Sequence, residues 1–123
     1  MTRTFLAVVG VAYLLLAGWC VAKPGQTSHS VGLTLQPGSG QSEYLVVYGG
    51  LQLGLGLFFL WPLLKSDAEP AVLMLCLILH ACLALMRTIS LVTYPGIQAT
   101  TYCLAGVEWS IFLGAVWRYC VRP

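Results

Sequence analysis

Four long apolar runs dominate the chain, and polar or turn-forming segments separate them. The runs cover about Phe5–Ala22, Tyr44–Leu64, Ala71–Val92 and Ala99–Tyr119. Each is long enough to cross the hydrocarbon core of a bilayer as a helix, which takes roughly 20 residues. Their hydrophobicity is continuous, whereas the strands of a membrane barrel alternate apolar and polar positions over about ten residues. The pattern therefore predicts four transmembrane helices.

The segments between the runs predict how these helices are connected. The two connectors "KSDAEP" and "TYPGIQ" are short, so the second, third and fourth helices should run up and down beside one another. The first connector, about residues 23–43, is longer and polar, and it predicts an external loop. We therefore expect an all-α membrane protein with a single domain over residues 1–123, an antiparallel four-transmembrane-helix bundle.

Composition indicates that lipid is the solvent for this chain. Only 8% of the residues are charged, 59% are hydrophobic, and the mean hydropathy is +0.84. An ordinary soluble domain carries about 25% charged residues, and one of this size has too much surface to bury so many apolar side chains. The net charge of +2 is too small to suggest a nucleic-acid partner.

The five cysteines have neither CxxC nor metal-type spacing, so no metal site is expected. A disulfide between Cys20 and Cys103, which share the outer half of the predicted fold, stays open.

The basic residues predict the orientation. Arg3, Lys65, Arg118 and Arg122 fall on one side of a four-crossing topology, and only Lys23 falls on the other. Because basic residues accumulate on the cytoplasmic side, we expect both termini to be cytoplasmic. The first run has no clear small-x-small cleavage site, so we expect it to be retained as a helix.

The second helix contains four closely spaced glycines, Gly49, Gly50, Gly54 and Gly56. On a regular helix, Gly50 and Gly54 share one stripe, with Glu43 above them at the outer rim, while Tyr48, Gln52 and Gly56 share the opposite stripe, with Gly49 beside it. Small residues four apart let membrane helices approach closely. Two interpretations stay open: both faces pack within the chain, or one face binds a second protein chain, as in a homo-oligomer or a larger membrane complex.

Two ionisable residues lie within the third apolar run. His80 and Arg87 are seven residues apart and share a helix face with, more loosely, Ser90. A charged residue at the bilayer centre costs roughly 2.5–3.5 kcal/mol, and such residues usually face inward and pair. When the hairpin folds about residues 95–96, Glu108 comes within one turn of Arg87, about 5 Å along the axis. We therefore expect Arg87 and Glu108 to pair, with His80 in the same seam.

The second helix brings two more polar residues toward this seam, with Gln52 at a similar depth and Tyr48 slightly above it. Together they complete the polar cluster: Tyr48, Gln52, His80, Arg87, Ser90 and Glu108. It is either an interhelical clamp that fixes the register or the lining of a cavity for a polar head, a quinone ring or a proton. Intramembrane ionisable residues are functional candidates, but a satisfied pair weakens that inference.

One block of the second helix carries a family resemblance. "E-x4-YGG-x3-GLGLF", from Glu43 to Phe58, resembles small, largely uncharacterised bacterial membrane proteins of the wider DoxX-like group, and the resemblance covers nearly the whole chain. Arg87, Ser90 and Glu108 match by position within their helices. The chain departs from that pattern in two places. No Arg follows Glu43 within residues 44–47, and "TYPG" replaces an acidic residue and Gly, which puts an outer-surface charge pair in doubt.

The resemblance implies a bacterial inner-membrane protein with an accessory or ligand-binding role, because that group includes membrane subunits of quinone-linked oxidoreductases and assembly helpers. We expect a non-catalytic protein, an accessory subunit or a binder of a lipid or quinone in a polar intramembrane cavity, with membrane lipids as neighbours. One alternative is a small proton-coupled transporter, although such carriers hold a carboxylate in the first helix and Phe5–Ala22 has none. The least favoured alternative is a membrane enzyme with His80 and Glu108 as an acid/base pair.

Overall fold

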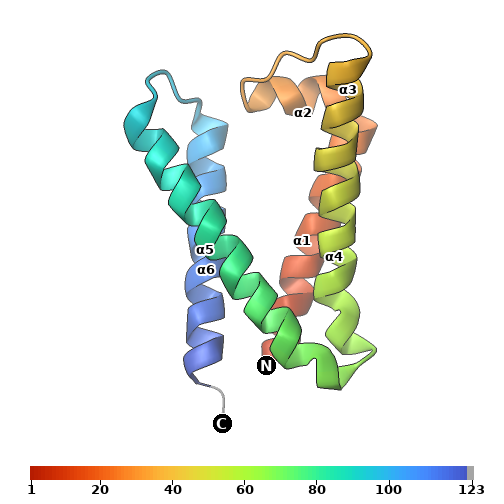
Figure 1. The fold of residues 1–123 in the computed structure, drawn as a ribbon, viewed down its shortest axis with the longest axis vertical. Helices are drawn as coiled ribbons and strands as arrows, with labels where there is room; N and C mark the ends of the chain where they lie inside the picture. Colours follow the sequence, from red (N-terminus) through yellow and green to blue (C-terminus); the bar gives the residue numbers. More distant parts are fainter. Residues whose placement is uncertain (122–123) are drawn as a thin grey trace.

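The computed structural model describes residues 1–121, and every regular element in that range is helical (Figure 1). The α-helices are α1 (Thr2–Ala22), α2 (Pro24–Ser30), α3 (Ser39–Tyr44), α4 (Gln52–Leu60), α5 (Glu69–Thr93) and α6 (Ala99–Cys120). A π-helix, η1 (Leu45–Leu51), joins α3 to α4, and two 3₁₀ helices, η2 (Trp61–Leu63) and η3 (Ser66–Ala68), join α4 to α5. Arg122, which the orientation argument counts, lies outside the described residues.

Four stretches are long and apolar enough to span a membrane: Thr2–Ala22, Ser39–Leu63, Ser66–Thr93 and Ala99–Cys120. Each coincides with one of the predicted runs, so the four membrane-length helices are confirmed. Proline sets the boundaries at both ends of α5. Pro70 occupies its first turn, where no hydrogen-bonded N–H is needed, and Pro95 forces Tyr94 into an extended conformation that ends the helix.

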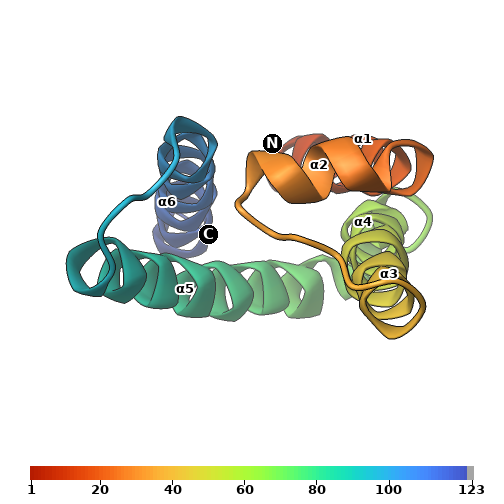
Figure 2. The same ribbon diagram turned by 90° about the horizontal axis from the view of Figure 1, so that it is seen from above.

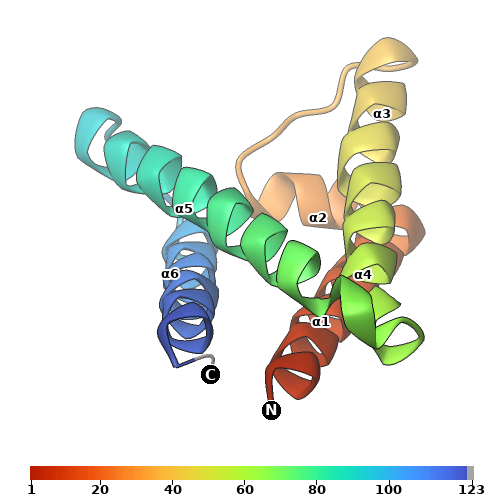
Figure 3. The ribbon, with the colours of Figure 1, turned by 60° about the horizontal axis from the view of Figure 1, so that its bottom comes forward.

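The long helices are arranged as two pairs. In Figures 1 and 3, α1 lies beside α4 and α5 lies beside α6, and contacts within these pairs far outnumber those between them. The pairs meet at the end that carries both termini and diverge toward the other end (Figure 1). A closed antiparallel four-helix bundle is therefore not confirmed.

The buried core lies where the two pairs meet. Its buried side chains come from all four long helices: Leu6, Val9, Phe59, Val72, Leu73, Cys76 and Ala115. Within the first pair, α1 and α4 touch through their backbones, because a Cβ added at Gly10 would lie 2.9 Å from the carbonyl oxygen of Gly56. Such backbone proximity is how helices gain packing energy in lipid, and it holds α1 on α4 more tightly than on α5.

The expected loop over residues 23–43 is partly wrong, because it contains α2 and most of α3. Pro24 starts α2, and the Tyr44 hydroxyl donates a 2.8 Å hydrogen bond to Thr27 Oγ1, which ties α2 to the C-terminal end of α3. Seen from above, α2 lies across the end of α1 and reaches toward α6 (Figure 2). At its tip, Gly32 has a φ of +80°, and a Cβ there would lie 3.7 Å from Gln98 Nε2. This segment therefore spans the divergent end of the two pairs.

Candidate functional site

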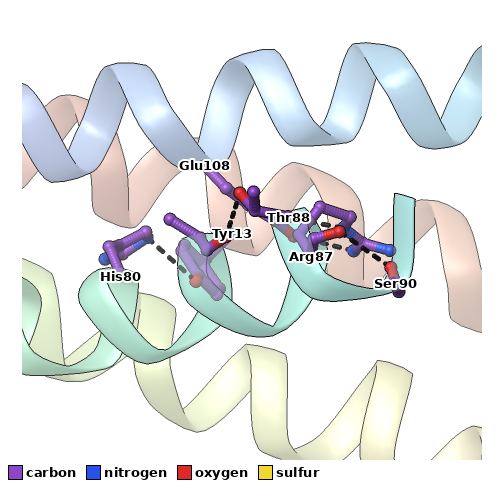
Figure 4. A network of polar contacts seen from close by, with 7 residues as sticks. Tyr13, His80, Arg87, Thr88, Ser90 and Glu108 are labelled. Carbon is purple, nitrogen blue, oxygen red and sulfur yellow. Dashed lines mark hydrogen bonds and ion pairs between the residues drawn. The ribbon is translucent and has the colours of Figure 1, made fainter. Parts of the chain in front are cut away.

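An ion pair joins α5 to α6 within the membrane-length part of the chain. Arg87 Nε and Nη2 donate hydrogen bonds of 2.9 and 2.8 Å to Glu108 Oε2 and Oε1 (Figure 4). This two-bonded fork is the strongest geometry for an arginine–carboxylate contact. The pairing expected from the hairpin register is therefore present. The pair is not sealed from its surroundings, because the side chains of Arg87 and Glu108 are 29% and 14% exposed.

The α5–α6 seam has a second polar tie beside this pair. Trp109 Nε1 donates a 3.1 Å hydrogen bond to Thr88 Oγ1, which itself donates to the Ala84 carbonyl. Ser90, a member of the predicted polar cluster, donates its hydroxyl hydrogen to the Arg87 carbonyl at 2.8 Å. The Ser90 hydroxyl thus bonds to its own helix, and it lies beside the ion pair without joining it (Figure 4).

His80 lies in a separate buried contact with α1. It is 1% exposed, its Nδ1 is 2.8 Å from the Cys76 carbonyl oxygen, and its Nε2 is 3.2 Å from the Tyr13 hydroxyl (Figure 4). A carbonyl only accepts hydrogen bonds, so Nδ1 carries the hydrogen and Nε2 accepts from Tyr13. Phe59 packs edge-on against the Tyr13 ring, with centroids 5.4 Å apart. This contact connects the two helix pairs.

The polar cluster predicted from the sequence is thus divided into two neighbouring centres. Within the described residues, no hydrogen bond joins His80 to Arg87 or Glu108, although the Glu108 carboxylate lies within electrostatic range of both Tyr13 and His80. The sequence analysis did not identify Tyr13 as a partner of His80. Tyr13 lies in α1, 67 residues before His80 in the sequence. The signal available was a tyrosine in the middle of an otherwise apolar run.

The second long helix contributes Tyr48 and Gln52, but its geometry differs from a regular α-helix. Tyr48 lies in η1, where its ring stacks on Tyr44 with centroids 4.4 Å apart and planes 15° apart. Tyr48 also lies within electrostatic range of Arg87 in the other helix pair. Gln52 Oε1 is buried and has no hydrogen-bond partner within the described part of the chain. A π-turn of this kind often marks a functional position in a helix.

The four glycines of this helix separate clearly into two faces. A Cβ at Gly49 would lie 2.8 Å from Val21 Cγ2, and one at Gly56 would lie 2.7 Å from Leu14 Cδ2, so both glycines face α1. A Cβ at Gly50 or Gly54 would meet nothing within 4 Å. Only one glycine face therefore packs within the chain. Glu43, the expected outer-rim residue, is exposed in α3.

The described residues show which side-chain groups near the site have partners and which do not. Among residues 1–121, no group of three or more His, Cys, Asp or Glu side chains could hold a metal ion. Cys20 and Cys103 are both free, Cys20 buried and Cys103 exposed. Arg87 Nη1 donates no hydrogen bond to any described residue, and Gln52 Oε1 accepts none. Arg87 therefore has a donor group to spare, and Gln52, on the second long helix, has a spare acceptor.

A family model described as a domain of unknown function, DUF4345, matches residues 1–119. No curated protein and no solved structure matches the chain. The family description names no activity, so the function has to be argued from the residues.

Proposed function

The chain belongs to the DUF4345 family, and we propose that it binds a small amphiphile, a lipid or a quinone, at the Arg87–Glu108 pair without catalysing a reaction on it. The observation that carries this proposal is the partial exposure of that pair, with 29% of the Arg87 side chain accessible. A pair that served only to join α5 to α6 would be most stable when fully enclosed between them, because charged groups facing lipid are costly. An exposed fork at this depth needs a polar neighbour.

The spare hydrogen-bonding groups define the chemistry of the head group. Gln52 Oε1 needs a donor, since a buried polar atom without a partner costs free energy. Arg87 is partly exposed, and its Nη1 can donate to an acceptor oxygen of a ligand. The ion pair is neutral as a unit, so an uncharged head that offers oxygens and a hydroxyl suits it. The carbonyl and hydroxyl groups of a quinone–quinol couple meet that need, and so do the ester and hydroxyl groups of a glycerolipid.

The arrangement of the helices supports the same location. Tyr48 and Arg87 belong to different helix pairs yet lie within electrostatic range of one another. The pairs diverge toward the end that α2 spans (Figures 1 and 2). An amphiphile held between them would complete the antiparallel four-helix bundle that the sequence predicts. The resemblance of the block from Glu43 to Phe58 to the DoxX-like group supports an accessory or ligand-binding role of this kind.

The proposal includes an orientation in the membrane. Arg3, Lys65 and Arg118 belong to the end that carries both termini and the α4–α5 connection (Figure 1), whereas Lys23 lies at the opposite end, between α1 and α2. The excess of basic residues favours the first end as the cytoplasmic one. We place the protein in the inner membrane with both termini in the cytoplasm. The amphiphile then lies in the outer half of the bilayer.

An association with a second chain is a further proposal, favoured by Gly50 and Gly54. These glycines have no neighbour within 4 Å of an added Cβ, and small residues four apart commonly mark contacts between membrane helices. The second chain would be another copy or a larger membrane protein that this chain assists.

Mass spectrometry after gentle extraction tests the amphiphile proposal. Wild type should carry one class of small amphiphile, and the variant Arg87→Met/Glu108→Leu should fold but lose it. The matched control is Arg3→Met/Glu69→Leu, because it removes the Arg3–Glu69 ion pair at the cytoplasmic end. That control should retain the bound molecule. Retention by the Arg87→Met/Glu108→Leu variant would mean that the pair is only an interhelical clamp.

A further inference from the structure

A groove with a different character lies between α1 and α6, at the end of the molecule that carries both termini. It has a volume of about 380 Å³ and is lined by Met1, by Thr4, Phe5 and Val8 from α1, and by Gly114, Trp117 and Arg118 from α6. Arg118 is ten residues beyond Glu108 on α6, about 15 Å along the helix axis. The groove is therefore separate from the Arg87–Glu108 pair, and no residue of the proposed amphiphile site lines it.

The shape of the groove depends on a close contact between its two helices. A Cβ added at Gly114 would lie 2.8 Å from Phe5 Cε2, so only a glycine lets the Phe5 ring lie against α6 at this point. Thr4 and Val8 are four residues apart on α1, as are Gly114 and Arg118 on α6, and each spacing places both residues on one helix face. Two helix faces thus form the walls of the groove.

The two ends of the groove differ in polarity. Since α1 and α6 run in opposite directions (Figure 1), Thr4 and Arg118 share the terminal end, and Val8 and Gly114 share the end nearer the membrane centre. The Arg118 guanidinium carbon lies 4.4 Å from the centroid of the Trp117 ring, a cation–π distance that holds the charge in place. Among the described residues that line the groove, Arg118 is the one with a charged side chain, and none has an acidic side chain.

We infer that this groove binds an anionic phospholipid, with the phosphate at Arg118 and Thr4 and the start of an acyl chain along Phe5 and Val8. Arg118 forms no ion pair with any of residues 1–121, and a guanidinium in this situation favours a phosphate, which it can bind through two parallel hydrogen bonds. Tryptophan and arginine at the end of a spanning helix lie at the depth of lipid head groups. The apolar inner end explains why the occupant is a lipid rather than a soluble phosphate. This inference stands independently of the proposed function.

Lipid titration of the full chain in detergent, read by native mass spectrometry, tests this assignment with phosphatidylglycerol and phosphatidylcholine as probes. Wild type should bind phosphatidylglycerol more tightly, and Arg118→Gln should reduce that preference about tenfold, the effect of losing one charge-assisted contact. Arg118→Lys should keep part of the preference. Val8→Trp should weaken both lipids, because Val8 is 65% exposed and a larger side chain there fills the apolar end.

The matched control is Lys65→Gln, which removes a positive charge from the connection between α4 and α5. This connection lies at the same end of the molecule (Figure 1), and Lys65 does not line the groove. Equal losses of preference in Lys65→Gln and Arg118→Gln would overturn the inference, because general attraction to the basic end would then explain the binding. Displacement of the lipid by excess glycerol 3-phosphate would show a phosphate site without a place for the chain. A dimer that dissociates in Val8→Trp would show that a second copy occupies the groove, and that would also overturn it.

Discussion

At the scale of single residues, the central feature is an arginine whose charge is balanced by the adjacent helix. The Arg87 fork uses two of its donors on Glu108 and leaves Nη1 for another partner. Ser90 and Thr88, which could compete for these groups, are bonded to backbone carbonyls of α5. The local sequence thus keeps one donor group of Arg87 available without leaving its charge uncompensated.

The first prediction concerns the two halves of this pair. Glu108→Gln leaves Arg87 without a counter-charge and should destabilise the protein by about 3 kcal/mol, the lower end of the range for breaking buried pairs, because the pair is partly exposed. Arg87→Met/Glu108→Leu should lose less than half of that, since neither charge remains unpaired. The free energies of unfolding of the single and double variants, measured in detergent micelles, give both losses. Equal losses in the single and double variants would show that the two side chains do not meet.

The contact between Tyr13 and His80 was not predictable from the sequence. Both residues are recognisable as polar positions within apolar runs, but their partnership depends on how α1 packs against α5. Hydropathy identifies the segments that lie in the membrane, but it does not determine which of these helices pack against one another. The Arg87–Glu108 contact could be predicted because a short turn between consecutive helices limits their register, and no such turn joins α1 to α5.

At the scale of elements, the helices were predicted well and the segment between the first two was not. Apolar runs of membrane length can be recognised directly in the sequence, and Pro95 marks the end of α5. In contrast, α2 has seven residues, and neither its composition nor its length distinguishes it from a loop. Its position depends on the hydrogen bond between Tyr44 and Thr27, which lie 17 residues apart. The π-helix η1 was missed because a regular 3.6-residue period was assumed across Gly49 and Gly50.

The second prediction compares two glycines of α4 that differ only in face. Gly56→Leu should destabilise the protein by about 1–3 kcal/mol, because the new side chain would overlap Leu14 and the backbone of Gly10. Gly54→Leu should change the stability by no more than about 0.5 kcal/mol, since its Cβ meets nothing within 4 Å. Thermal unfolding of both variants in one detergent provides the comparison. Equal losses would contradict the assignment of the two faces.

The same two variants test the association with a second chain. If another copy packs on Gly50 and Gly54, Gly54→Leu should reduce the molecular mass measured in mild detergent while Gly56→Leu leaves it unchanged. Identical masses in wild type and Gly54→Leu would argue that this face contacts lipid.

At the scale of the whole molecule, two helix pairs meet at one end and separate at the other (Figure 1). Each pair is held together by a specific contact. In the α1–α4 pair it is the backbone contact between Gly10 and Gly56, and in the α5–α6 pair it is the Arg87–Glu108 ion pair. Between the pairs the buried core and the Tyr13–His80 contact act only over part of the length. The sequence predicted four helices in one domain, but a closed bundle does not follow from hydropathy, because lipid or a ligand can satisfy the same apolar faces.

The central claim is that a small amphiphile lies between the pairs, next to Tyr48 and Arg87. The most direct measurement is photo-cross-linking in native membranes from a benzophenone amino acid placed at position 48, with a second probe at Leu57, which is 56% exposed on the same long helix. The account predicts one small amphiphile attached at position 48, absent when Arg87→Met/Glu108→Leu is added, and ordinary bulk phospholipids at position 57. The same mixture of bulk phospholipids at both positions, unchanged by Arg87→Met/Glu108→Leu, would contradict it.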